Sequence, residues 1–170
     1  KSTEWDENGQ IITELNYKDG QRWDGYWTGL EDDEVYECTW TSQGNYKKGK
    51  KHGKWTGLID PESLDDDNIF IDKYSKIEKH YKNGKLDGKV TQWHGNGQIE
   101  TEENYKDGEL HGKWTEWFEN GQKHIEETYK KSNLDGKRTE WDENGQLRNK
   151  CVFKNDEVIG GVEFPEDIPF

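Results

Sequence analysis

The chain repeats itself every 24 residues, and this period constrains its fold more than any other feature. The motif WHGNGQ at 93–98 returns without a gap as WFENGQ at 117–122 and as WDENGQ at 141–146. Between these stretches, YKNGKLDGK at 81–89 returns as YKDGELHGK at 105–113 and, in degraded form, at 129–137 and 153–161. Self-similarity at a fixed short period indicates a modular array. Function is therefore expected on the surface of the array and not in one pocket.

A landmark aromatic residue allows the array to be traced through the irregular first half of the chain. It falls at Tyr17, Tyr46, Tyr81, Tyr105, Tyr129 and Phe153, with gaps of 29, 35, 24, 24 and 24 residues. The two longer gaps predict insertions near 31–44 and 59–77. We interpret residues 1–162 as one array of about six units, and 163–170 as a C-terminal cap or tail.

Composition favours an ordered chain made of strands. Ile, Leu, Val and Phe make up only 28 of 170 residues and the net charge is -13, a combination typical of disorder. However, the chain has 9 Trp and 8 Tyr, and each buried aromatic side chain removes about 150–250 Å² from water. It has no Ala, the best helix former. No apolar run approaches the roughly 20 residues that span a bilayer.

Each unit carries two hairpin signals, Asn-Gly at one end (120–121) and Asp-Gly or Asn-Gly at the other (107–108, 83–84). Both positions of a type I′ turn need a positive φ, which these residues tolerate. The expected fold is all-β: an elongated single-sheet antiparallel meander of 24-residue β-hairpin repeats. A glycine recurs on the return strand, where we expect an aromatic ring of the neighbouring strand to lie over it. Its positions are Gly25, Gly53, Gly88, Gly112, Gly136 and Gly160.

The two cysteines and the first residue bear on compartment. Cys38 and Cys151 lie near opposite ends of the array, where we expect their separation to exceed the ~7 Å that a disulfide allows between Cα atoms. The chain starts at Lys1 and not at a methionine, which slightly favours an exported or cell-envelope protein.

At the level of the repeat unit, the sequence resembles the MORN repeats. The pattern is Trp93, Asn-Gly at 96–97, Tyr105, Asp-Gly at 107–108 and Gly-x-Trp at 112–114. It is similar to the bacterial variant of the family, the YwqK type, many of whose members are identified as the antitoxin of a toxin-antitoxin pair. The resemblance covers Trp5 to about Val162 and implies a MORN-type repeat fold. It leaves function open, because a fold does not fix an activity.

Two rows of tryptophans are the candidate partner-binding residues. They are Trp93, Trp117 and Trp141 before the Asn-Gly turns, and Trp27, Trp55 and Trp114 on the return strands. Stacked aromatic side chains bind peptides, glycans or flat rings, but they equally well form a core. The alternative that both rows are core stays open.

The sequence offers little for metal, cofactor or catalytic chemistry. The acidic run with Asp65, Asp66 and Asp67 could hold Ca²⁺, but it lacks EF-hand spacing and a solvated loop is the simpler interpretation. His52 and His111 occupy equivalent repeat positions, too far apart to share a metal. No catalytic motif appears, so we expect neither an enzyme nor a cofactor.

The net charge bears on partners. An acidic chain is repelled by nucleic acid and by anionic membranes, and it suits a basic protein. The first hypothesis is a non-enzymatic protein-binding scaffold, in its sharper form an acidic antitoxin-like inhibitor of a basic partner. The alternative is an exported bacterial surface protein, adhesive or self-associating through its sheet edges. A third is carbohydrate binding by a tryptophan ladder.

Overall fold

The computed structural model describes residues 1–9, 11–33, 38–59 and 76–163. The chain divides into two compact units, unit 1 at Lys1–Gly88 and unit 2 at Lys89–Phe170. Within the described ranges all regular structure is strand, and these ranges contain no helix that could cross a membrane. The assignment of 1–162 to one array stays a prediction, because a compact unit of a repeat array is not by itself an independent domain.

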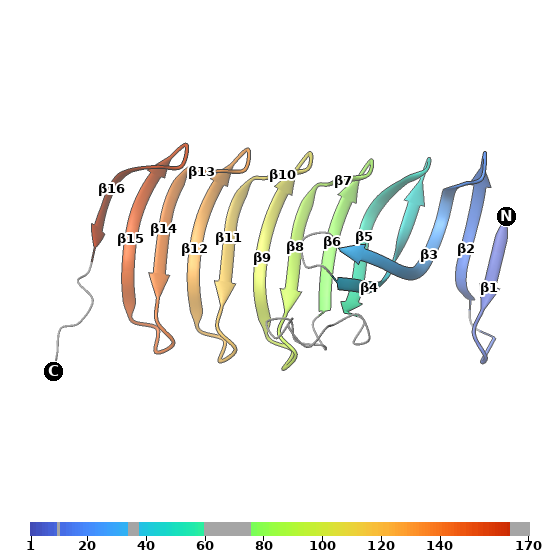
Figure 1. Cartoon of the computed structure of the whole chain (residues 1–170), viewed down its shortest axis with the longest axis horizontal. Helices are drawn as coiled ribbons and strands as arrows, with labels where there is room; N and C mark the ends of the chain where they lie inside the picture. The colour runs from blue at the N-terminus through green and yellow to red at the C-terminus, as the bar shows by residue number, and fades with distance from the viewer. Residues whose placement is uncertain (10, 34–37, 60–75, 164–170) are drawn as a thin grey trace. The chain divides into compact units, whose positions relative to one another are not determined.

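Unit 1 is built of antiparallel hairpins that follow one another in sequence order (Figure 1). Its strands are β1 (Ser2–Trp5), β2 (Ile11–Lys18), β3 (Gln21–Asp33), β4 (Cys38–Lys47), β5 (Lys50–Ile59), β6 (Lys76–Lys82) and β7 (Lys85–Leu86). Consecutive strands pair from β1 to β6, and β7 pairs with β6. Strands β3 and β4 stay paired out to Asp33 opposite Cys38. The insertion expected near 31–44 therefore lengthens a hairpin, whereas most of the one near 59–77 lies outside the described residues.

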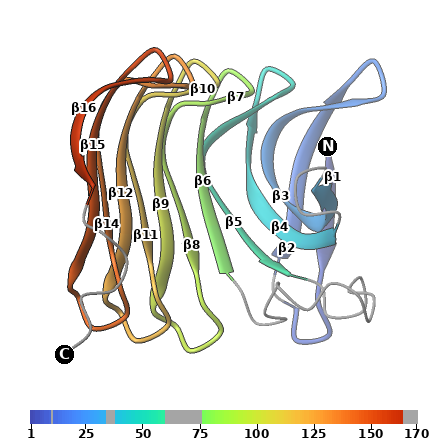
Figure 2. The ribbon, with the colours of Figure 1, turned by 60° about the vertical axis from the view of Figure 1, so that its left-hand side comes forward.

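Unit 2 repeats the same construction with greater regularity. Its strands are β8 (Gly88–Trp93), β9 (Ile99–Lys106), β10 (Glu109–Leu110), β11 (Gly112–Trp117), β12 (Lys123–Lys130), β13 (Asn133–Leu134), β14 (Gly136–Trp141), β15 (Leu147–Lys154) and β16 (Glu157–Glu163). Their order is β8-β9-β11-β12-β14-β15-β16, with β10 on β9 and β13 on β12. Figure 2 shows these strands side by side as one curved layer. In both units the predicted all-β antiparallel meander of β-hairpins is confirmed.

The two ends of a repeat use different turns. At the end that follows the landmark tyrosine, Asp107 and Gly108 have φ values of 54° and 93°, which confirms the expected type I′ geometry. At the other end, Gly121 has a φ of 79° and Asn120 has no positive φ. The Gly121 N–H donates to the Phe118 carbonyl at 2.8 Å. The prediction of a type I′ turn is therefore wrong at Asn120 and Gly121, where a longer turn leaves glycine alone left-handed, and it holds at Asn83 and Gly84, whose φ values are 54° and 84°.

The repeated glycine marks a bulge and does not lie under a ring. Leu110 lies opposite Tyr105, whereas Thr115 lies opposite Glu102, so the return strand holds two extra residues. The φ of Gly112 is 101°, a conformation that favours glycine. A Cβ added to Gly112 would have the Asn104 Cβ as its nearest neighbour, at 3.6 Å. The expectation that an aromatic ring lies over Gly112 is therefore wrong. Glycine is favoured there because the backbone of the bulge has a positive φ.

An aromatic cluster forms the core of unit 1. Leu15, Trp27 and Trp55 are buried, and Tyr46 and Tyr81 pack against them. The Trp55 ring centroid lies 5.7 Å from that of Trp27, 5.3 Å from that of Tyr46 and 6.2 Å from that of Tyr81. Such pairs stabilise a fold by about 0.5–1.5 kcal/mol each beyond burial alone. Unit 1 therefore gains its stability partly from contacts between repeats, as a repeat array must.

Unit 2 joins its repeats through polar side chains at the turns. The Asn96 side-chain amide donates to the Glu119 carbonyl at 2.9 Å, and 24 residues later Asn120 donates to the Glu143 carbonyl at 2.9 Å. Each turn is thus bound to the next by its own asparagine. The Asn of the Asn-Gly pair is needed for this bridge, and not for a left-handed turn position.

Candidate functional site

Four glutamates of unit 2 lie on one face of the sheet, with a tryptophan and an arginine between them. This surface, here called the acidic face, consists of Glu103, Glu116, Glu127 and Glu140 with Trp114 and Arg138. Side chains alternate between faces along a strand, and cross-strand partners share a face. Trp114 lies opposite Glu127, and Ile125 lies opposite both Glu116 and Glu140. The row Glu103, Trp114, Glu127, Arg138 therefore crosses β9, β11, β12 and β14.

Glu127 is the most enclosed carboxylate of the acidic face, with its side chain 9% exposed. Its Oε2 accepts a 2.6 Å hydrogen bond from the Tyr129 hydroxyl. Arg138 Nε lies 3.4 Å from Oε1, but Nε is not aligned to donate a hydrogen bond, so the contact is an ion pair. Burial, followed by the bond to Glu127, raises the pKa of Tyr129. The Tyr129 hydroxyl therefore remains a donor at neutral pH.

Glu103 occupies the same repeat position as Glu127 but has a different neighbour. Its Oε2 accepts a 2.6 Å hydrogen bond from Tyr105, and its Oε1 accepts a 3.4 Å hydrogen bond from the Trp114 indole N–H. Trp114 stands where Arg138 stands one repeat later. Two neutral groups therefore bind the carboxylate of Glu103, whereas a cation faces that of Glu127.

The second row of the acidic face is more open. The Glu116 side chain is 34% exposed, and its Oε1 lies 3.1 Å from His124 Nδ1. The His124 ring packs on Phe118 with centroids 4.3 Å apart. Glu140 Oε2 lies 3.6 Å from the Arg138 guanidinium. Arg138 thus pairs with glutamates of both rows.

The opposite face of the sheet in unit 2 carries acids that pair with lysines. Lys89 Nζ lies 2.9 Å from Glu102, and Lys113 and Lys123 lie 3.2 Å and 2.9 Å from Glu126. The bond from Lys123, opposed by burial and aided by Lys113, lowers the pKa of the Glu126 carboxyl. Charge is compensated on this face, so the acidic face is the better candidate for attracting a cation.

The structure separates the six tryptophans singled out from the sequence. Trp27 and Trp55 are 6% and 3% exposed in the core of unit 1, with Arg22 and Lys51 over their rings. Trp114 is half-buried on the acidic face. Trp93, Trp117 and Trp141 are half-buried at strand ends, and the register shifts just before Trp117 and Trp141. Trp114 is the tryptophan that hydrogen-bonds to a glutamate of the acidic face.

Other residues from the sequence analysis fall outside this site. The Ca²⁺ candidates Asp65, Asp66 and Asp67 lie outside the described residues. Within the described part of the chain, no group of three or more His, Cys, Asp or Glu side chains could hold a metal ion. Cys151 is a buried free thiol whose Sγ donates to Asn149 Oδ1 at 3.2 Å. The landmark Tyr17 is 49% exposed.

The glutamates of the acidic face were missed by the reasoning from the sequence, although a signal for them exists. Glu103 and Glu127 each precede a landmark tyrosine by two residues, and Glu116 and Glu140 are also 24 residues apart. A charged residue that recurs on the tyrosine's side of a strand could have been found from this period. The abundance of acids in the chain hid the pattern.

Comparison with known proteins supports the repeat interpretation. A family model described as MORN repeat variant matches residues 1–19, 86–107, 110–131 and 134–155. The matched segments include all six residues of the acidic face. A search of the curated proteins found no match.

Proposed function

Because the chain belongs to the MORN repeat variant family, whose repeats generally mediate protein binding, we propose that it binds a basic protein partner through the acidic face of unit 2. In its sharper form, the protein is a non-enzymatic, antitoxin-like inhibitor that covers the cationic surface of its partner. The contrast between Glu103 and Glu127, one facing neutral groups and the other a cation, is the observation that carries this proposal.

Arg138 shows how a basic side chain can bind between two glutamates of the acidic face. Its guanidinium lies between Glu127 and Glu140, at 3.4 Å and 3.6 Å from their carboxylates. One repeat earlier, Glu103 and Glu116 occupy the equivalent places around Trp114. An arginine or lysine from a partner can dock there with the same two carboxylates.

Trp114 adds a second attraction at this position. Its ring is half-buried, so one part of the ring remains accessible. A cation over a Trp ring gains about 0.5–2 kcal/mol, and a guanidinium can stack on the ring while it pairs with carboxylates. The docking position at Glu103, Trp114 and Glu116 therefore favours arginine over lysine.

The wider charge of the unit supports recruitment of a basic partner. Residues 89–170 contain 18 Asp and Glu against 11 Lys and Arg. An excess of one sign steers an oppositely charged partner and raises its association rate, most strongly at low ionic strength. The interaction should therefore weaken as salt is added.

The test compares two double variants that remove the same charge from different surfaces. Glu103→Gln with Glu116→Gln changes the acidic face, and Glu102→Gln with Glu119→Gln is the control. The affinity of each protein for a fluorescein-labelled oligo-arginine peptide is measured by anisotropy at low and high salt. Glutamine keeps one carbonyl oxygen, which can accept the bond from Tyr105, and it loses the second oxygen, which accepts from the Trp114 indole N–H.

We expect the first variant to weaken peptide binding about tenfold, equivalent to about 1.4 kcal/mol, and the control to bind like the natural protein. The natural partner, recovered from an extract of the source organism by salt elution, should follow the same order. Equal affinities for both variants would contradict the assignment to the acidic face. Binding that does not respond to salt would contradict a basic partner.

Self-association is a second candidate, favoured by the last strand. On β16, Val158 and Ile159 are 62% and 63% exposed, and the strand pairs with β15. An edge strand with exposed apolar side chains is a template for pairing with another chain. Sedimentation equilibrium tests this: an oligomer that dissociates on Val158→Lys with Ile159→Lys supports it, and a monomer at all concentrations contradicts it.

A further inference from the structure

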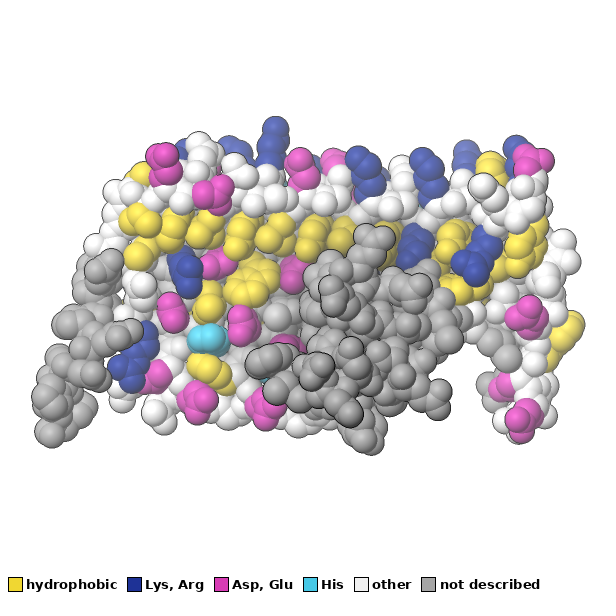
Figure 3. Space-filling model, viewed as in Figure 1, with side chains coloured by type: hydrophobic (Ala, Val, Ile, Leu, Met, Phe, Trp, Pro, Cys, Tyr) yellow, Lys and Arg dark blue, Asp and Glu magenta, His cyan; other side chains and the backbone are white. Residues whose placement is uncertain are grey.

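Unit 1 carries a basic patch on a chain whose net charge is -13. The patch lies on two neighbouring hairpin turns, β4–β5 and β6–β7. It consists of Lys47, Lys48, Lys50, Lys82 and Lys85, all of them exposed. Residues 46–52 and 81–86 contain no acid. Lys and Arg side chains project beyond these turns at the top of Figure 3. We call this surface the tip patch.

The backbone holds the two turns against each other. The Gly84 N–H donates to the Lys51 carbonyl at 2.9 Å, and a Cβ added to Gly84 would lie 3.4 Å from the Lys50 Cβ. Lys47 lies directly opposite Lys50, and Lys82 directly opposite Lys85. The five ammonium groups are therefore concentrated by the fold and not only by the sequence.

Folding alone does not account for this arrangement. Like charges directly opposite each other on paired strands are destabilising. Lys48 also has a φ of 51°, where four other turns use Asp19, Asn83, Asp107 and Asn155, residues that tolerate this conformation better. One turn of unit 2 likewise uses a lysine, Lys131. The opposed lysines go against the first preference and Lys48 against the second. A binding role accounts for their combination on two adjoining turns.

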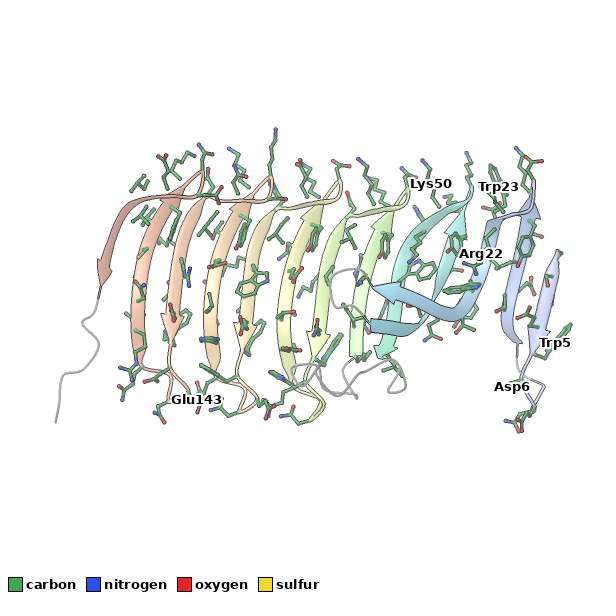
Figure 4. All side chains as sticks on the ribbon, viewed as in Figure 1. Trp5, Asp6, Arg22, Trp23, Lys50 and Glu143 are labelled. Atoms are coloured by element: carbon green, nitrogen blue, oxygen red, sulfur yellow. The ribbon has the colours of Figure 1, made fainter. Side chains whose placement is uncertain are left out.

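An aromatic side chain lies at the same edge. The Gly49 N–H donates to the Trp23 carbonyl at 2.7 Å, and the Trp23 ring lies 3.6 Å from the position of a Cβ added to Gly49. Figure 4 labels Trp23 and Lys50 at the turn edge of unit 1. Lys18 Nζ lies 4.5 Å from the centre of the Trp23 ring. The tip patch thus borders on a half-buried indole that already contacts a lysine.

We infer that the tip patch binds a short acidic segment of a protein. The patch is two hairpins wide, about 10 Å from strand spacing, in a chain that carries 37 Asp and Glu against 24 Lys and Arg. Charges further away than about 8 Å are screened at physiological salt, so a short anion senses the five lysines and, beside them, Asp24, whose Oδ1 accepts a 2.7 Å hydrogen bond from the Lys48 N–H. A long polyanion, such as nucleic acid, extends into repulsive surroundings. Lysines also lack the bidentate geometry that arginines bring to phosphates.

The protein would then have two surfaces of opposite preference. The acidic face of unit 2 binds a basic partner, and the tip patch of unit 1 binds an acidic segment. A scaffold with both can hold two different proteins, or two parts of one protein. This inference does not depend on the proposed function, because the residues of the two surfaces do not overlap.

The test uses fluorescein-labelled hexaglutamate as the probe and the full chain as the protein. The variant Lys48→Asn with Lys50→Gln and Lys85→Gln removes three charges and gives the turn a residue that tolerates a positive φ, so it should fold at least as well as the natural protein. The control is Lys130→Gln with Lys131→Asn, which removes two charges from a single turn of unit 2 and places Asn at the position equivalent to Lys48. Thermal unfolding of each variant checks the fold.

We expect the triple variant to bind hexaglutamate about tenfold more weakly, given the modest strength of exposed charge pairs. The control and the Glu103→Gln, Glu116→Gln variant should bind it as the natural protein does. The same titration with oligothymidylate of equal charge and with phosphatidylserine vesicles should give weaker binding. No binding of hexaglutamate, equal loss in the control, or tighter binding of the oligonucleotide or the vesicles would each overturn the inference.

Discussion

Arg138 Nε lies 3.4 Å from Glu127 Oε1, at a repeat position that holds a tryptophan one repeat earlier. In the repeat that lacks the tryptophan, an ion pair between Arg138 and Glu127 therefore takes the place of the aromatic side chain. The carboxylate of Glu127 is nearly buried, and a nearly buried charge needs a partner. Arg138 supplies the charge, and Tyr129 supplies the hydrogen bond.

The Arg138–Glu127 pair should stabilise unit 2 measurably. Replacing Arg138→Met removes the cation and leaves the carboxylate of Glu127 without it. Loss of a buried partner costs several kcal/mol, but Arg138 is one-third exposed, so we expect a loss of about 1–2 kcal/mol in the free energy of unfolding. Urea denaturation measures it, with Lys137→Met on the exposed side of the same strand as the control.

A double-mutant cycle isolates the pair from other effects of the substitution. Glu127→Gln, Arg138→Met and the double variant should give a coupling free energy of about 1 kcal/mol, with the double variant more stable than the sum of the single losses predicts. A coupling near zero would mean that Arg138 acts through packing alone.

Tyr129 should make the free energy of unfolding decrease as the pH rises in the alkaline range. Its pKa is raised in the folded state by burial and by Glu127, whereas an unfolded tyrosine ionises near pH 10. The unfolded state therefore releases its proton first, and the contribution to stability, complete below about pH 10, is lost as the pH rises further. Urea denaturation above neutral pH should show a smaller decline for Tyr129→Phe than for the natural protein, and an identical decline would contradict this assignment.

Glu126 should make the free energy of unfolding decrease as the pH falls into the acid range. The bond from Lys123 lowers the pKa of Glu126 in the folded state below the value of 4.5 expected without it. Its contribution is thus present above about pH 4.5 and is lost as the pH falls through the lowered pKa. Its side chain is 28% exposed, so the effect should stay below about 1 kcal/mol. In acid titrations of stability, Glu126→Gln should flatten this loss, while Glu119→Gln at an exposed turn should not.

Gly44 should not accept any side chain. The Trp55 ring lies on Gly44, so an added Cβ would overlap ring atoms. Because Trp55 is fixed by the core of unit 1, the strain cannot relax easily, and Gly44→Ala should cost about 1–3 kcal/mol. Gly160→Ala is the matched control, since nothing lies within 4 Å of its added Cβ. Near-ultraviolet circular dichroism should report the displaced Trp55, and equal stabilities of the two variants would contradict this packing.

Most of the fold could be predicted from the repeat, but one turn type and the role of the repeated glycine could not. The type I′ turn at Asp107 and Gly108 follows from residues that tolerate a positive φ. The same reasoning failed at Asn120, because its side chain bonds to the next turn at Glu143, a contact between residues in different repeats. The glycine at 112 was expected under a ring, but two extra residues in its strand place it in a bulge.

The candidate surfaces were harder to predict than the fold. Trp27 and Trp114 share a repeat position, yet one is core and the other borders a glutamate. Their environments differ because their neighbours at the preceding strand differ, Leu15 in one repeat and Glu103 in the other. Local sequence does not say which residue lies across a strand pair, since register depends on bulges.

The sequence by itself determined the 24-residue period, the strands and the family, because hairpin turns and alternation are local properties of the chain. Only the tertiary structure decided which charges meet. It placed Glu127 against Arg138 across two strands, and it brought the lysines of two separate turns together. These relationships depend on register and on contacts between repeats, where a shift of one residue would move every side chain to the other face.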